Sequence, residues 1–167
     1  VEDWLRYGSP ESLALFMYGQ PKRAKRLHFD VIPKTVDEYY QHLGKISTQE
    51  DAALLENPVW HIHSGLPSLS VLPVSFTLLL NLAAVCHAEA PDIVWGYVTD
   101  YAPDVSPASH PELDRMIGYA VNYYQDLVRP QKIYRLPNEK EKNHLQALKH
   151  ALADLPDHAS GEDIQSV

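Results

Sequence analysis

Four cations lie within five residues near the start of the chain. We call Lys22, Arg23, Lys25 and Arg26 the basic cluster, and Lys34, near the start of an expected helix, extends it. Clustered Lys and Arg side chains suit phosphate binding, because several cations together can neutralise a densely charged backbone. Such a run is also common on a solvated surface that binds nothing. The basic cluster therefore predicts either a phosphate-contact site or a plain basic surface.

A second, sparser group of cations consists of Arg129, Lys132 and Arg135. These residues lie at and beyond the C-terminal end of an expected helix. Cations stabilise that end, because the last carbonyl groups of a helix leave a partial negative charge there. We favour this structural interpretation over phosphate binding for these three residues.

The segment Trp60-His61-Ile62-His63 contains two histidines at a spacing used for metal ligands. In an extended chain, residues two apart point to the same side, so both imidazoles could bind one ion. A metal hydrolase would need further ligands, and the remaining histidines, such as His87 and His110, follow no recognisable ligand spacing. We therefore predict no metal site and expect ordinary loop or core histidines.

Other catalytic arrangements find little support. The pairs Asp37-Glu38 and Glu50-Asp51 are adjacent on expected helices, so their carboxylates should diverge rather than meet at a substrate. The sequence contains no G-x-x-x-x-G-K, G-x-G-x-x-G or G-x-S-x-G motif. Cys86, the only cysteine, has no nucleophile motif and can form no disulfide within the chain, which favours a reducing, cytoplasmic compartment.

The charges are unevenly distributed along the 167 residues. The net charge is −8, but residues 1–45 hold seven Lys or Arg against six acids, while residues 46–128 hold one against ten. Residues 129–167 hold six of each. This pattern is compatible with a protein that touches phosphate at a few places, and equally with one that has no nucleic-acid partner. The longest apolar run, residues 76–86, is too short to cross a bilayer, which needs about 20 residues.

Thirteen prolines divide the chain into short segments that favour helices. Helix signals include N-terminal caps, proline in the first turn and apolar residues three and four apart. We expect one helix to start at Ser9-Pro10, a second at Pro33 with Gly44 after its end, and a third at a capping box of Thr48 and Asp51. A buried helix is expected over 75–87, followed by helices from Ala90-Pro91 to Tyr101 and from Pro111 to Val128. Asn138 is expected to cap the last helix, with Leu145, Leu148, Leu152 and Leu155 facing inward. Residues 26–32 alternate in polarity, which predicts a short extended stretch.

These elements predict a mainly α fold, an irregular helical bundle whose N-terminal part could hold one or two short strands. The run from Asp3 to Tyr18, followed by P-K-R-A-K-R-L at 21–27 and F-D-V-I-P at 29–33, resembles the class I lysyl-tRNA synthetases. The segment N-P-V-W-H-I-H at 57–63 is also similar to that family. The resemblance extends over almost the whole chain, and it is specific because several long stretches occur in the family's order.

The resemblance implies a parent enzyme that joins lysine to its tRNA through a lysyl-adenylate, using ATP with magnesium in the cytoplasm. Neither H-I-G-H nor K-M-S-K-S occurs here, so no catalytic residue can be transferred to this chain, and we expect no cofactor in it. We interpret the chain as a fragment that follows K-M-S-K-S. Residues 1–45 would form a stem-contact-like connecting region, and residues 46–167 an incomplete helical cage for the anticodon side.

Within that family, the expected partners are lysine tRNA and the missing catalytic and C-terminal domains of the same chain, without a membrane. The basic cluster and Lys34 would contact tRNA phosphates. Contacts from Trp60, His61, His63, Arg129, Lys132 and Arg135 are secondary candidates, since aromatic and imidazole rings often stack on unpaired bases. The alternative is a helical protein-interaction module with no RNA role, which the acidic middle of the chain favours.

Overall fold

Helices joined by turns make up the computed structural model, which describes residues 1–19, 21–22, 28–67 and 72–156. No strand occurs in these ranges, so the mainly α fold is confirmed. The chain divides into two compact units, Val1–Gln131 and Lys132–Val167. Among the described helices, none is long and apolar enough to cross a membrane.

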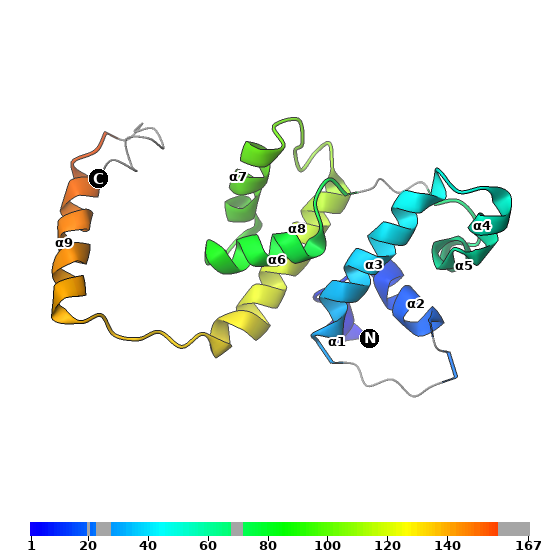
Figure 1. Cartoon of the computed structure of the whole chain (residues 1–167), viewed down its shortest axis with the longest axis horizontal. Coiled ribbons are helices and arrows are strands. Elements are labelled where there is room, and N and C mark those ends of the chain that lie inside the picture. The colour runs from blue at the N-terminus through cyan, green and yellow to red at the C-terminus, as the bar shows by residue number, and fades with distance from the viewer. Residues whose placement is uncertain (20, 23–27, 68–71, 157–167) are drawn as a thin grey trace. The chain divides into compact units, whose positions relative to one another are not determined.

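The first half of the larger unit consists of five helices, in which α2 packs against α3 and α5 (Figure 1). They are α1 (Glu2–Leu5), α2 (Pro10–Tyr18), α3 (Val31–Ile46), α4 (Asp51–Glu56) and α5 (Pro58–His63). The cap expected at Ser9 is confirmed, because its side chain accepts a hydrogen bond from the Ser12 amide at 3.2 Å. Trp4, fully buried, donates to the Ser12 hydroxyl at 3.1 Å and so attaches α1 to α2.

The start of α3 corrects the extended stretch expected over residues 26–32. Phe29 and Asp30 form a turn, and Val31 already begins the helix; Arg26 and Leu27 lie outside the described residues. Pro33 fits inside the first turn because amide groups there have no partner within the helix. Ile32 is fully buried in the core when it is part of this helix, and that burial favours the helix over the extended conformation that the alternating pattern predicted.

The α3 helix also extends further at its C-terminal end than the sequence predicted. The helix continues through Gly44 to Ile46, and the capping box expected at Thr48 and Asp51 is wrong. The Thr48 hydroxyl donates instead to the Lys45 carbonyl at 3.0 Å, and Glu50 stands before α4 without a side-chain cap. Thr48 thus closes α3 rather than opening α4.

The second half of the larger unit is built on α6, which packs against α3, α7 and α8. Its elements are α6 (Phe76–Val85), α7 (Pro91–Tyr101), α8 (Pro111–Tyr123), a π-helical turn η1 (Tyr124–Val128) and a 3-10 turn η2 (Arg129–Gln131). The expected stripe of α8 is confirmed, since Leu113, Met116 and Ile117 are at most 1% exposed. The α6 helix is less buried than expected: Leu78 is 41% and Val85 79% exposed.

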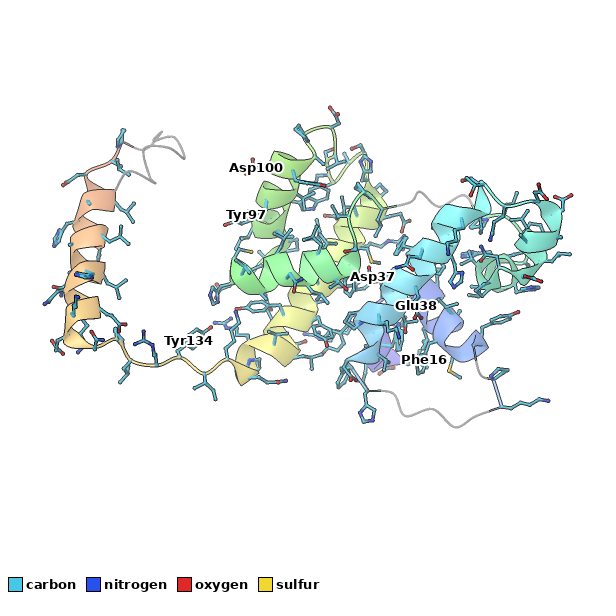
Figure 2. The ribbon with its side chains drawn as sticks, in the orientation of Figure 1. Phe16, Asp37, Glu38, Tyr97, Asp100 and Tyr134 are labelled. Atoms are coloured by element: carbon cyan, nitrogen blue, oxygen red, sulfur yellow. The ribbon has the colours of Figure 1, made fainter. Side chains whose placement is uncertain are left out.

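Two carboxylates connect segments far apart in the sequence. Asp37 on α3 accepts from the amides of Phe76 at 2.6 Å and Thr77 at 3.1 Å, and from the Thr77 hydroxyl at 2.5 Å. It therefore caps the start of α6, while its neighbour Glu38 also projects from α3 (Figure 2). Asp126 on η1 accepts from Arg6 Nε at 2.5 Å and the Tyr7 hydroxyl at 3.1 Å.

The smaller unit contains the helix α9 (Glu139–Ala153) after an irregular stretch. Its expected cap at Asn138 is confirmed as a capping box, in which Asn138 and Glu141 each accept from the other's backbone amide at 2.9 Å. Leu145, Leu148 and Leu152 were expected to point inward, but they are 55%, 42% and 41% exposed. Leu155, the fourth residue of the expected inward face, is half-buried. The local cap thus formed as predicted, whereas three of the four leucines expected in a core are exposed.

Candidate nucleic-acid interface

Lys22 is the described member of the basic cluster, and it is exposed four residues after the end of α2. Arg23, Lys25 and Arg26 lie outside the described residues, so their phosphate contacts stay a prediction. Lys34 on α3 has an 80% exposed side chain, 3.8 Å from a Glu38 carboxylate oxygen. A pair this exposed contributes little stability, and Lys34 can exchange it for a phosphate at small cost.

Tyr18, the last residue of α2, stacks on His61 of α5. Their ring centroids are 5.6 Å apart and the rings are 12° from parallel. Tyr18 is 47% exposed and His61 is exposed as well, so the pair lies at the surface. The His61 Nε2 donates to the Leu55 carbonyl at 2.7 Å, because a carbonyl can only accept, and this bond fixes the imidazole ring.

The helical state of residues 58–63 overturns the extended geometry that would bring His61 and His63 together. Residues two apart on an α-helix point about 200° apart around its axis. His61 is exposed, whereas His63 is half-buried and its Nε2 lies 2.9 Å from the Tyr39 hydroxyl. Within the described ranges, no group of three metal-ligating side chains comes together.

Asn57 determines where this short helix begins. Its side-chain oxygen accepts from the Val59 amide at 3.0 Å, and its amide nitrogen donates to the His42 carbonyl at 2.9 Å and to Gln49 at 2.8 Å. Asn57 is 3% exposed, and Trp60 beyond it is half-buried. The segment 57–63 is therefore fixed on α3, and a smaller fraction of Trp60 than of His61 is exposed.

Burial controls the ionisation of the groups behind α5. It raises the pKa of Tyr39 well above the usual value for a phenol, so the hydroxyl facing His63 keeps its proton at neutral pH. Burial also lowers the pKa of His42, with Lys45 contributing in the same direction, which favours a neutral imidazole. His42 thus adds no fixed positive charge that would help to bind phosphate.

The second group of cations is divided between the two units and is largely engaged. Arg129 in the larger unit lies 3.4 Å from Glu89. Arg135 in the smaller unit donates to both carboxylate oxygens of Glu141, at 2.7 and 2.6 Å, which lowers the pKa of Glu141. Lys132, also in the smaller unit, is half-buried. A phosphate role for either arginine would require exchange of an existing partner.

A hollow of about 550 Å³ lies between α3 and residues 72–75. Asp37, Tyr40 and Gln41 line it. The carboxylate of Asp37 is already bound to the start of α6, and burial raises the pKa of Tyr40, keeping that phenol neutral. The hollow thus offers no unpaired charge to a phosphate.

Sequence reasoning did not single out Tyr18 as a candidate, although it precedes the first residue of the basic cluster by four positions. An exposed aromatic residue at a helix end next to cations is the available signal. Tyr18 and His61 are 43 positions apart in the sequence, and no local pattern predicts a contact between residues so far apart.

Comparisons with known proteins identify similar sequences along the entire chain. A family model described as class I tRNA synthetases (K) matches residues 1–66. A lysine–tRNA ligase of Roseobacter denitrificans is 44% identical over 167 residues, and that alignment covers 100% of this chain and 32% of the relative. The lysine–tRNA ligases of Rickettsia conorii and Rickettsia bellii are 43% and 44% identical over 99% of this chain and 32% of each relative. The chain thus spans about a third of the length of these relatives, and no solved structure matches it.

Proposed function

Since the chain belongs by sequence to the class I lysyl-tRNA synthetase family, we propose that it is a tRNA-binding, non-catalytic portion of an enzyme that joins lysine to its tRNA. The observation that carries this proposal is the 44% identity to a lysine–tRNA ligase over all 167 residues. We assign the chemistry to the part of the relatives that this chain does not cover. H-I-G-H and K-M-S-K-S do not occur in this sequence, which supports that assignment.

In the proposed enzyme, ATP with magnesium activates lysine as an adenylate in the cytoplasm, and this portion holds the tRNA. Residues 1–45 act as a stem-contact-like connection and residues 46–167 as part of a helical cage near the anticodon. Its partners are lysine tRNA and the other domains of the longer chain. Nothing in its own side chains is assigned to ATP, lysine or magnesium.

The proposed contact surface consists of the basic cluster with Lys34. Lys22 and Lys34 are exposed, and the loose 3.8 Å pair of Lys34 leaves its charge available to solvent. The proposed role is positioning by phosphate contact, which adds affinity and salt dependence but no sequence discrimination. The net charge of −8 restricts binding to such local basic surface, because the remainder of the chain repels the tRNA backbone.

A salt series tests this function. The affinity of the chain for lysine tRNA is measured at several salt concentrations, for the wild type and for a variant with Lys22, Arg23, Lys25 and Arg26 changed to Ala. The proposal expects binding whose logarithmic salt slope falls by about three to four units in the variant, since each phosphate contact contributes about 0.7 to 0.9. A matched control changes Lys140, Lys142 and Lys149 of α9 and should leave the slope unchanged. Equal slopes for all proteins, or no binding, would reject the proposal.

A protein-interaction module is the second candidate, favoured by the exposed leucines of α9. Leu145, Leu148 and Leu152 recur at helical spacing and are 41–55% exposed. An exposed apolar stripe of this kind suits association with another protein surface. Binding to a protein partner that is insensitive to salt, together with no affinity for tRNA, would favour this candidate.

A further inference from the structure

The stacked rings of Tyr18 and His61 form an unusual surface feature of the larger unit. Their centroid distance of 5.6 Å and interplanar angle of 12° describe a parallel, offset pair. By comparison, the pair of Trp4 and Phe16 places one ring at 0% exposure, within the core. Tyr18 is 47% exposed and His61 is exposed, so this pair lies in water with ring surface accessible.

Both rings are positioned before any ligand arrives. Tyr18 ends α2, which packs directly on α5, the helix that carries His61. The His61 ring is further held by its 2.7 Å hydrogen bond to the Leu55 carbonyl. Asn57 fixes the start of α5 through its hydrogen bonds to Val59 and to the His42 carbonyl. A ligand that adds to this pair therefore orders little of the protein, which favours binding.

The polar atoms of the pair are also available. With Nε2 donating to Leu55, Nδ1 is the second polar atom of the His61 ring, and within the described part of the chain that atom has no hydrogen-bond partner. The Tyr18 hydroxyl has none there either. Lys22, an exposed cation, follows Tyr18 by four residues. A planar aromatic surface thus carries a ring nitrogen and a hydroxyl, and a cation follows four residues later in the sequence.

We propose that the pair of Tyr18 and His61 is a stacking site for an unpaired nucleobase of tRNA, with Lys22 on an adjacent phosphate. This inference rests on the proposed tRNA-binding function and deepens it. An unpaired base is the occupant that matches, because it presents a π-face, hydrogen-bonding edges and a neighbouring negative charge together. An apolar protein side chain would use neither Nδ1 nor Lys22, and paired bases within a duplex have no free face.

The first test compares variants of the chain in binding to lysine tRNA. Tyr18→Ala should weaken binding about tenfold, while the salt slope stays as in the wild type, because stacking releases no counterions. Tyr18→Phe keeps the ring and should bind within about twofold of the wild type. Met17→Ala is the matched control, since Met17 is 56% exposed next to Tyr18 but does not take part in the stack. If Tyr18→Ala binds like the wild type, the stacking site is rejected.

A second measurement is independent of whether a variant folds. The wild-type chain is titrated into a short oligouridine with one central 2-aminopurine, whose fluorescence changes when the base stacks on an aromatic ring. We expect a fluorescence change for the single strand and none for the same strand annealed to its complement. Equal responses of both, or no response, would overturn the inference.

The two experiments also separate this inference from the proposed function. If tRNA binding depends on the basic cluster but not on Tyr18, the proposed function stands and the stacking site is wrong. If the chain binds no tRNA at all, both fail. If Tyr18→Ala weakens binding while Tyr18→Phe preserves it, both are supported.

Discussion

Replacing Asp37 by Ala should destabilise the larger unit, because this carboxylate caps α6 from another helix. The change removes acceptors for two backbone amides and one hydroxyl, at 2.6, 3.1 and 2.5 Å. A hydrogen bond to a charged group contributes about 1.5–3 kcal/mol, and a neutral one about 1 kcal/mol. The hydrogen bonds to Thr77 are exposed, and water can replace Asp37 as the acceptor for the freed amides. We therefore expect the free energy of unfolding to fall by about 2–3 kcal/mol in total. That is a large fraction of the roughly 5–15 kcal/mol typical of a folded domain.

Urea unfolding monitored by tryptophan fluorescence measures this loss. All three tryptophans, Trp4, Trp60 and Trp95, belong to the larger unit, so the signal reports on it alone. The neighbouring Glu38→Ala is the matched control, since the ion pair of Glu38 with Lys34 is exposed and as long as 3.8 Å. The control should change the free energy of unfolding by less than about 0.5 kcal/mol. If Asp37→Ala costs no more than Glu38→Ala, the capping argument is refuted.

Three further predictions concern the core, α5 and the acid limb of stability. Leu79→Ala, at a 0% exposed position, should cost about 2–5 kcal/mol in the same assay, whereas Leu78→Ala, 41% exposed, should cost less than about 1 kcal/mol; equal costs would contradict the packing of α6. Asn57→Ala should lower the unfolding free energy by about 2 kcal/mol, seen as a lower urea midpoint, because a cap and two further hydrogen bonds are lost. Arg6 holds the pKa of Asp126 in the folded protein below its usual value. The pair therefore stabilises the fold fully at pH values above the ordinary aspartate pKa, and this contribution is lost as the pH falls through the lower pKa of the folded state. Asp126→Asn should therefore give a flatter acid limb in pH-dependent thermal unfolding, and an unchanged limb would contradict this assignment.

Local signals predicted the parts of the fold that local interactions determine. The Ser9 cap, the buried stripe of α8 and the cap at Asn138 all depend on residues within one or two helical turns. The sequence also contained a signal that was missed at α5: Asn57 before Pro58 is a cap followed by a first-turn proline, which favours a helix over the extended arrangement expected for the two histidines. Reading that signal first would have removed the metal alternative on geometric grounds.

The contacts that hold the helices of the larger unit together could not be predicted from local sequence patterns, because they join residues far apart in the chain. Asp37 meets α6 across about 40 residues, and Arg6 meets Asp126 across 120. The stack of Tyr18 on His61 is of the same kind, because its partners are brought together only when α2 packs on α5. The resemblance of the sequence to a family therefore led to the proposal of a nucleic-acid partner, whereas the stack of Tyr18 and His61 could be recognised only in the folded structure.

Photo-crosslinking of this chain to lysine tRNA carrying 4-thiouridine, with the adducts located by mass spectrometry, tests the account most directly. We predict adducts on residues 18–26 and 60–63, reduced when Lys22, Arg23, Lys25 and Arg26 are all changed to Ala. Adducts confined to α7 or α9, or no adducts under conditions where the chain is folded, would contradict the assignment of a tRNA-contact surface to this part of the molecule.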